Sequence, residues 1–229
     1  MKRLAIIPAR GGSKRIPRKN MRDFHGQPII GYAIQLALKS NLFDEVFVST
    51  DDEEIAQYAL DQGAHVPVLR TAKNSDDYAT TSDVLEEVLM YYHKLGIEPS
   101  MCCCIYPTAP LLVETDLIEA LEVFTTGTFD TLISAVAFDF PIQRAFKRTA
   151  SGTVELIQPE KITTRSQDLE TCYHDAGAFY FFHAAKFLST KNLWEGKVGS
   201  YLLPETRVQD IDTETDWQMA ELKYTLSRE

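Results

Sequence analysis

The chain has 229 residues, of which 45% are hydrophobic and 24% charged, and its formal net charge is −10. This balance excludes a disordered chain and disfavours nucleic acid or an anionic membrane as a partner, because polyanions are bound by extended basic faces. Pro8 closes the first apolar run too early for a signal peptide, and no segment approaches the ~18 apolar residues of a membrane span. We therefore expect one cytoplasmic domain over residues 1–229.

Short apolar runs alternate with helical patterns along most of the chain. Runs rich in Val, Ile and aromatic residues predict strands at residues 4–9, 45–50, 65–69, 102–107, 131–137 and 176–182. Apolar residues at helical spacing predict helices around residues 29–37, 55–60 and 84–92. The alternation predicts a three-layer α/β fold with a mainly parallel central sheet and helices on both faces. Ligands of such folds bind beyond the carboxyl ends of the strands.

The pattern changes between residues 140 and 171. The segments PIQRAFKR and SGTVELI, followed by a polar stretch, predict a hairpin and an excursion from the sheet. We interpret residues 140–171 as a small insertion within the domain. It would either cover the site or contact another subunit.

Cysteines are concentrated in the apolar run MCCCIYP, which holds Cys102, Cys103 and Cys104. Adjacent residues of a strand point to alternate faces, so the three thiols cannot hold a metal at this spacing. Together with Cys172 they predict small, reduced core residues, as in a reducing compartment.

The basic loop after the first strand, IIPARGGSKRIPRKN at residues 6–20, combines two adjacent glycines with Lys and Arg side chains, although the protein is acidic. Glycines let backbone N–H groups approach phosphate oxygens, and the cations supply charge. The loop matches neither G-x-x-x-x-G-K-[ST] nor G-x-G-x-x-G, which disfavours a Walker-type NTPase and a Rossmann dehydrogenase. It predicts a site for a small, multiply charged anion, and a solvated basic loop is the alternative.

The motif PARGGSKRIPRKN resembles the signature of the CMP-sugar synthetases, cytidylyltransferases that activate nonulosonic acids and related sugar acids. The resemblance extends over residues 4–222. It implies a nucleotide-diphospho-sugar transferase-like, Rossmann-like fold and a homodimer joined through the insertion. It also implies a loop around the triphosphate of CTP, formed by Arg10, Gly11, Ser13, Lys14, Lys19 and Asn20. Arg10 and Lys19 would be catalytic, because fixed cations stabilise charge on the transferred phosphoryl group and on departing pyrophosphate.

The segment LRTAKNSDDYATTSDVLEEV resembles the base and ribose pocket of the same family. The matching nucleotide-binding residues are Arg70, Asp77, Ala79, Thr80 and Thr81. A hydroxyl-rich helix entrance offers side-chain and backbone groups to a pyrimidine. The alternative is that the hydroxyls of residues 80–82 only cap the next helix.

The segment VQDIDTETDW carries Asp210 and Asp212 two positions apart, so both carboxylates face one side of an extended chain. Mg²⁺ prefers oxygen ligands and combines one or two carboxylates with water and substrate phosphates. The alternative is a cap on the last helix, supplied by one of the acids around Thr213. The resemblance favours Mg²⁺ at both aspartates and makes Asp212 a catalytic candidate.

The segment TTRSQDLETCYHDAGAFYFF resembles the sugar-binding motif of these enzymes. The implied sugar-binding residues within it are Arg165, Gln167, Tyr173 and His174. Tyr106 and Arg144, which lie outside the segment, complete the set. An arginine can bind the sugar carboxylate as a fork, whereas the Gln, Tyr and His could instead be structural hydrogen bonders.

The combination of TRSQDLETCYHDAG with QDIDT near the end is more similar to pseudaminic acid cytidylyltransferases, whose sugar is less polar. The departures from the sialic acid pattern at Tyr106, Leu112 and Ala176 are consistent with such a sugar, because buried polar groups without partners are costly. The implied reaction couples CTP to pseudaminic acid and releases pyrophosphate. Sialic, legionaminic or 3-deoxy-manno-octulosonic acid are alternative substrates. A non-catalytic nucleotide-sensing module and a small-molecule kinase are alternatives of other classes.

Overall fold

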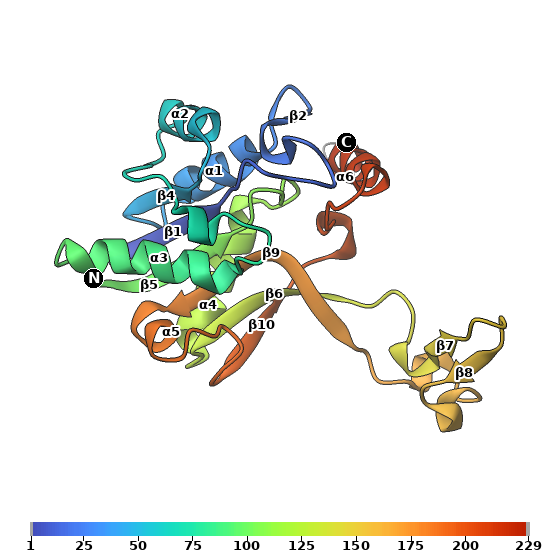
Figure 1. Ribbon diagram of the computed structural model, residues 1–229. Coiled ribbons are helices and arrows are strands. Elements are labelled where there is room, and N and C mark those ends of the chain that lie inside the picture. The colour runs from blue at the N-terminus through green and yellow to red at the C-terminus, as the bar shows by residue number, and fades with distance from the viewer. Residues whose placement is uncertain (1, 228–229) are drawn as a thin grey trace.

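The computed structural model describes residues 2–227 and contains a six-stranded central sheet between helices (Figure 1). Its strand order is β10-β6-β9-β5-β1-β4. The strands are β1 (Lys2–Pro8), β4 (Glu45–Ser49), β5 (Pro99–Ile105), β6 (Thr131–Ala137), β9 (Tyr173–His183) and β10 (Val198–Leu202). β9 is antiparallel to β5 and β6, and the other neighbours pair in parallel. The predicted α/β class with a mainly parallel sheet is confirmed.

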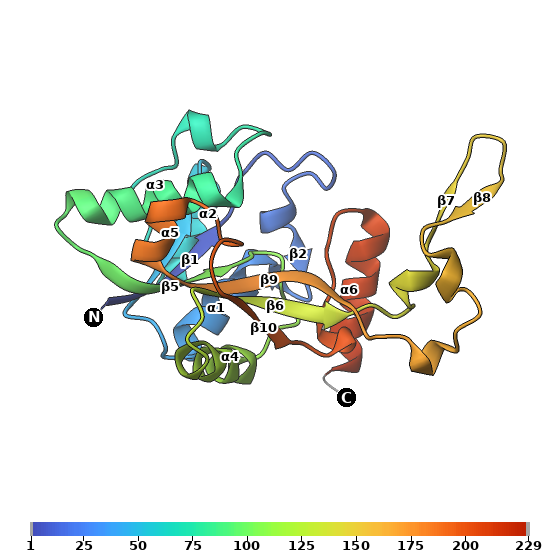
Figure 2. The ribbon, with the colours of Figure 1, turned by 90° about the horizontal axis from the view of Figure 1, so that it is seen from below.

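Helices cover both faces of this sheet, as Figure 2 shows. The helices α1 (Ile30–Lys39), α2 (Glu53–Asp61) and α4 (Glu114–Thr126) contribute apolar residues to one core cluster. The helices α3 (Thr81–Lys94) and α5 (Ala184–Thr190) contribute to the cluster on the opposite face. The three layers follow from burial of one apolar stripe of each helix against the sheet.

The strand β5 shows how the core is divided. Cys103 packs in the cluster with α1 and α4, whereas Cys102 and Cys104 pack in the cluster with α3 and α5. These three thiols are free and fully buried, and burial raises the pKa of each one. The prediction that they are reduced core residues is confirmed. Cys172 is also free but only partly buried.

The last helix, α6 (Glu214–Leu226), packs against the segment that follows the basic loop. Phe24 lies edge-on to Trp217, with ring centroids 5.5 Å apart. Arg22 lies over the Trp217 ring at 4.2 Å and donates two hydrogen bonds to Glu214, at 2.6 and 2.7 Å. This segment includes the short strands β2 (Asp23–Phe24) and β3 (Gln27–Pro28). The packing brings the carboxyl-terminal part of the chain beside the basic loop.

Between β6 and β9 the chain leaves the sheet and projects away from the body of the molecule (Figures 1 and 2). The strands β7 (Phe146–Arg148) and β8 (Val154–Leu156) form an antiparallel hairpin within it, as predicted. Short 3-10 helices occupy Ile142–Arg144, Pro159–Lys161 and Ser166–Asp168. Residues 138–172, which we call the excursion, therefore have little of the main core to pack against.

Other local predictions were wrong or incomplete. Residues 65–69 are not a strand, because only His65 bridges to Phe47 and Pro67 lacks the N–H that a ladder needs. In α2, Leu60 does not lie on the buried stripe, since it is 49% exposed. The predictions also omitted α4, α5 and β10. Among the described residues, no helix is both long enough and apolar enough to cross a membrane.

Candidate active site

Residues that follow β1 and β5 surround a cavity of about 220 Å³ at the carboxyl ends of these strands. We call it the cation pocket, because four of its ten lining residues are Arg or Lys. Its lining is Pro8, Arg10, Ser13, Lys14, Arg15, Lys19, Asn20, Tyr106, Pro107 and Thr108. Five of the residues predicted to bind the nucleotide thus meet here with one predicted to bind the sugar.

The basic loop is held in place by the loop that follows β4. The N–H of Gly11 donates to the Asp51 carboxylate at 2.9 Å, and a Cβ on Gly11 would lie 2.5 Å from Oδ2 of Asp52. Only glycine fits this approach. Arg18, which has a left-handed conformation with φ of 56°, forms ion pairs with Asp52 and Glu54. Arg18 therefore points its charge away from the cation pocket.

The predicted base-binding segment folds over the same loop. The Asp77 carboxylate forms an ion pair with Lys14 and lies 3.4 Å from Nη1 of Arg10. These cations lower the pKa of Asp77, the Lys14 hydrogen bond contributing most. Ala79 donates its N–H to the Asp76 carboxylate at 2.8 Å. The segment thus lies where it can contact a ligand of the basic loop.

The two threonines of this segment have different partners. Thr80 is the N-cap of α3 and forms a capping box with Asp83, which is the structural alternative expected from the sequence. The hydroxyl of Thr81 lies 2.8 Å from the hydroxyl of Tyr106, in the lining of the cation pocket. Thr81 therefore joins the start of α3 to the end of β5.

Arg70 is buried and does not line the cation pocket. Its guanidinium donates to the hydroxyl of Ser49 at 3.0 Å and to the carbonyl oxygen of Ser49. Burial lowers its pKa. Through these hydrogen bonds, Arg70 stabilises the carboxyl end of β4.

A second cavity, of about 370 Å³, lies beside the carboxyl end of β6. We call it the acid pocket. Its lining is Val136, Ala137, Asp139, His174, Glu205, Val208, Gln209, Asp210, Asp212, Asp216 and Lys223. As predicted, Asp210 and Asp212 face one cavity, while Ile211 between them is buried in the cluster with α6.

The cap of α6 does not use either aspartate of the pair. Thr213 is the N-cap and Asp216 completes the capping box. Oδ2 of Asp216 accepts hydrogen bonds from the N–H groups of Asp212 and Thr213, at 3.1 and 2.7 Å. The carboxylates of Asp210 and Asp212 are therefore not needed for helix capping.

The two pockets meet at Asp212. Nη1 of Arg15 lies 2.6 Å from Oδ2 of Asp212, and Nζ of Lys19 lies 3.8 Å from Oδ1. Lys19 also donates a hydrogen bond to the carbonyl oxygen of Ile211. Burial lowers the pKa of Lys19, whereas burial and the neighbouring Asp212 raise the pKa of Asp210. Cations of the basic loop and carboxylates next to α6 thus form one site.

This donor set fits Mg²⁺ bound together with a substrate. No group of three or more His, Cys, Asp or Glu residues suited to a metal occurs in the described part of the chain. Two carboxylates lining one cavity are nevertheless the usual protein share of a Mg²⁺ site, in which water and phosphate oxygens complete the shell. Burial and the neighbouring Asp212 charge raise the pKa of Asp210. The same poorly solvated negative charge attracts a cation.

The predicted sugar-binding residues are not all brought together within one chain. Tyr106 lines the cation pocket, and His174 lines the acid pocket with its ring 4.7 Å from that of Phe138. Tyr173 is 49% exposed at the start of β9. The remaining three, Arg144, Arg165 and Gln167, belong to the excursion and lie away from the cation pocket (Figures 1 and 2). Arg144 donates to the carbonyl oxygen of Thr164 within that excursion.

Two features of the site were not predicted from the sequence. One is Arg15, which does not fall on the matched positions of the loop signature and yet contacts Asp212. The other is Asp175, whose carboxylate accepts hydrogen bonds from the Tyr180 hydroxyl at 2.5 Å and the Gly177 N–H at 2.8 Å. Tyr180 packs edge-on against Tyr106, at 5.6 Å between centroids. Proximity of Arg15 to Lys14 in the sequence was the only available signal.

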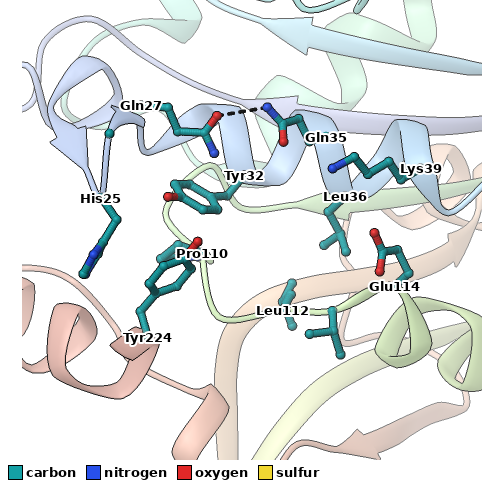
Figure 3. A pocket seen from close by; sticks show the side chains of 12 residues that line it. His25, Gln27, Tyr32, Gln35, Leu36, Lys39, Pro110, Leu112, Glu114 and Tyr224 are labelled. Atoms are coloured by element: carbon teal, nitrogen blue, oxygen red, sulfur yellow. Dashed lines mark hydrogen bonds between the residues drawn. The ribbon is translucent and has the colours of Figure 1, made fainter. Parts of the chain in front are cut away.

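Leu112, one of the departures from the sialic acid pattern, lines neither the cation pocket nor the acid pocket. It is buried and lines a different cavity, of about 490 Å³, between α1, the turn before β3, and α6. Figure 3 shows this cavity, where Gln35 donates a 2.9 Å hydrogen bond to Gln27 while Tyr224 lies opposite on α6. It contains none of the predicted nucleotide-binding residues.

A mainly parallel sheet whose carboxyl edge carries a cationic loop facing a pair of carboxylates defines a nucleotide-binding transferase. The sequence profile of the family described as Cytidylyltransferase matches residues 4–215, and the chain belongs to this family.

Individual relatives agree with this assignment. The chain is 43% identical over 229 residues to a protein from Campylobacter jejuni named pseudaminic acid cytidylyltransferase, covering 100% of this chain and 99% of the relative. It is 32% identical over 241 residues to a CMP-N,N'-diacetyllegionaminic acid synthase from Legionella pneumophila, covering 100% and 99%. A solved CMP:2-keto-3-deoxy-manno-octonic acid synthetase complexed with CTP has a TM-score of 0.71 at 17% identity, over 100% of this chain and 99% of that one. The last comparison shows a shared fold.

Proposed function

We propose that this protein couples CTP to pseudaminic acid, giving CMP-pseudaminic acid and pyrophosphate. The structural observation that carries the proposal is Asp212, which lies within 2.6 Å of Arg15 and 3.8 Å of Lys19. A triphosphate on the basic loop would therefore lie beside the carboxylate pair. The choice of sugar is supported by the 43% identity to the Campylobacter jejuni relative over its whole length.

In the proposed reaction, the anomeric hydroxyl of the sugar attacks the α-phosphorus of CTP. A bond forms between the sugar oxygen and phosphorus, and the bond from phosphorus to the β-phosphate oxygen breaks to release pyrophosphate. Arg10, Lys14 and Lys19 would hold the phosphate oxygens, since fixed cations lower the barrier without reorganising. Arg10 can bind two oxygens as a fork, whereas the lysines act as point charges.

Asp210 and Asp212 would hold Mg²⁺ against the same phosphates. Bound there, Mg²⁺ would neutralise charge on the α-phosphoryl group and on the leaving pyrophosphate. Before binding, Asp212 must part from Arg15 and Asp77 from Lys14. We assign the proton of the anomeric hydroxyl to Asp212 or to solvent beside it, since Asp212 is the carboxylate of the pair that contacts Arg15 and Lys19 of the basic loop.

For the cytosine and ribose we propose the segment from Asp77 to Thr81, which folds over the basic loop. The Thr81 hydroxyl is bonded to Tyr106 in the pocket lining, and the N–H of Ala79 is bonded to Asp76, the residue before the paired Asp77. Arg70 would act indirectly, by stabilising the carboxyl end of β4.

A homodimer is part of the proposal, because the excursion carries apolar side chains that its own chain leaves uncovered. Phe140 is 82% exposed, and the set with at least 38% exposure is Phe138, Phe140, Ile142, Phe146, Val154, Ile157 and Ile162. Apolar surface of this kind marks an interaction site. In a dimer, the excursion of one protomer could bring its Arg165 and Gln167 to the sugar bound by the other.

The function is tested by measuring pyrophosphate release from CTP and Mg²⁺ with a panel of purified acids: pseudaminic, legionaminic, sialic and 3-deoxy-manno-octulosonic. We expect pseudaminic acid to give the highest kcat/KM. A higher kcat/KM for another acid would mean that this acid is the substrate, while the type of reaction would stay as proposed. CTP binding without consumption would favour a sensing module, and release of CDP would favour a kinase.

A further inference from the structure

Arg15 occupies an unusual position between the two pockets. It lines the cation pocket, and its guanidinium is bonded at 2.6 Å to Oδ2 of Asp212, which lines the acid pocket. The side chain of Arg15 is 68% exposed, and that of Asp212 is 32% exposed. Arg15 can therefore leave Asp212 without disturbing any packed core.

The other cations of the basic loop make a longer contact with the carboxylate pair or none. Lys14 is paired with Asp77, on the segment proposed to contact the nucleotide. Arg18 is paired with Asp52 and Glu54, neither of which lines either pocket. Lys19 lies farther from Asp212 than Arg15 does, and its ammonium is bonded to the backbone at Ile211. Among these four, Arg15 makes the closest contact with the carboxylate pair.

We propose that Arg15 is an exchangeable counter-ion that holds the place of the divalent cation on Asp212 and moves to the phosphates when the cation binds. This inference rests on the proposed function and deepens it by assigning a positioning residue. A divalent cation and a guanidinium on the same carboxylate repel each other and compete for its negative charge, so each weakens the binding of the other. Once displaced, Arg15 still lies in the wall of the cation pocket, where phosphate oxygens are its natural partners.

One consequence is a coupling between metal and phosphate binding. Without a metal, Arg15 is retained by Asp212 and contributes little to anion binding. Without an anion, the metal must displace Arg15 and gains no phosphate ligand in return. Binding of either ligand therefore makes binding of the other more favourable, which is positive coupling through one side chain.

The first test measures Mn²⁺ binding to nucleotide-free protein by electron paramagnetic resonance, using Mn²⁺ as the probe for the divalent site. In Arg15→Ala we expect Mn²⁺ to bind about fivefold more tightly than in the wild type, as for loss of an exposed ion pair. Arg15→Lys should lie between the two. Arg18→Ala is the matched control, since it removes an arginine of the same loop whose partners lie outside both pockets, and it should leave Mn²⁺ binding unchanged.

The second test measures binding of inorganic pyrophosphate by calorimetry, with and without Mn²⁺. In the wild type we expect Mn²⁺ to tighten pyrophosphate binding, and in Arg15→Ala we expect this enhancement to shrink. Unchanged or weaker Mn²⁺ binding in Arg15→Ala would overturn the proposal, as would an unchanged enhancement. Circular dichroism and thermal unfolding of each variant check the fold, and Arg15→Gln serves if Arg15→Ala unfolds.

These binding measurements are independent of turnover. If the acid panel gave no CMP-sugar but Mn²⁺ bound more tightly in Arg15→Ala, the reaction would be wrong and the counter-ion role would stand. If the reaction were confirmed but Arg15→Ala behaved like the wild type toward both probes, only the role of Arg15 would fall.

Discussion

The ammonium group of Lys19 lies 3.8 Å from Oδ1 of Asp212, and burial nevertheless lowers the pKa of Lys19. Desolvation is thus the dominant influence, although both Asp212 and Asp210 favour the charged form. A lysine that stabilises phosphates must be protonated, so its loss of a proton on the alkaline side should abolish the stabilisation.

We predict that kcat/KM for CTP falls on the alkaline side below the pH at which an ordinary lysine titrates, and that this limb disappears in Lys19→Arg, whose guanidinium keeps its proton. The check is a pH–rate profile of pyrophosphate release for both proteins at saturating sugar. Lys19→Met should lose about a hundredfold in kcat/KM across the whole profile, as for removal of one fixed donor to a developing charge. An unaltered alkaline limb in Lys19→Arg would assign it to another group.

Substitutions of Asp210 and Asp212 should separate effects on stability from effects on activity. Burial and Asp212 raise the pKa of Asp210, so the native state holds its proton more tightly than the unfolded state does. The contribution of Asp210 to the free energy of unfolding therefore falls as the pH rises from the pKa of Asp210 in the unfolded state to its higher pKa in the native state. We predict that Asp210→Asn raises Tm at pH 7 and weakens Mn²⁺ binding.

Asp212→Asn should abolish Mg²⁺-dependent pyrophosphate release while the protein stays folded, because the cap of α6 is formed by Thr213 and Asp216. Thermal unfolding, Mn²⁺ binding and turnover of the two single variants measure the three quantities. Turnover close to the wild type in Asp212→Asn would contradict the metal assignment.

The ion pair between Asp116 and Arg207 lies outside the site, and the prediction for it concerns stability. Asp116 at the start of α4 is fully buried, and its Oδ1 lies 2.8 Å from Nη2 of Arg207. Burial raises the pKa of Asp116, and the charge of Arg207 opposes this rise. We predict that Arg207→Met lowers the free energy of unfolding at pH 7 by about 2 kcal/mol, less than for a fully buried pair because Arg207 is partly exposed.

The pH dependence of that loss has a definite sign. Without Arg207 the pKa of Asp116 rises further above its unfolded value, so the destabilisation should shrink as the solution is acidified. Urea unfolding between pH 5 and pH 8 measures it. The double variant Asp116→Asn with Arg207→Met should recover most of the lost free energy at pH 7, and a double variant no better than Arg207→Met alone would argue against an unpaired charge.

The sequence predicted the sheet and its buried helices because both depend on apolar periodicity. The stripe of Val84, Leu85, Val88 and Leu89 is fully buried on α3. β10 was missed because none of its residues is buried and Gly199 and Ser200 interrupt it, as an edge strand allows. The helix α4 buries Leu117, Ala120, Leu121 and Phe124, which have the same helical spacing as the stripe of α3.

The site was predictable where it is local and not where it depends on packing over long distances. The glycine pair, the cations and the Asp210–Asp212 spacing can each be read from a few residues. The contact between Arg15 and Asp212 exists because α6 packs on the segment after the basic loop, through Phe24 and Trp217. No short pattern encodes that packing.

The position of the excursion leads to the last prediction, which concerns the source of the sugar-binding arginine. Arg165 and Gln167 are exposed on the excursion, whereas Tyr106 and Asp212 belong to the two pockets of the main body. If Arg165 serves the site of the other protomer, the variants Arg165→Ala and Asp212→Asn should each be inactive alone. A mixed dimer would contain one site with an intact Asp212 from one chain and an intact Arg165 from the other.

We therefore predict that co-expressing the two inactive variants with different affinity tags, and purifying the doubly tagged species, restores about half of the wild-type turnover, since one of two sites is complete. The matched control is Arg165→Ala co-expressed with itself under both tags, which should stay inactive. Pyrophosphate release with CTP and pseudaminic acid is the readout. An inactive mixed dimer would mean that Arg165 acts in its own chain, because then one of the two sites would lack Arg165 and the other would lack Asp212.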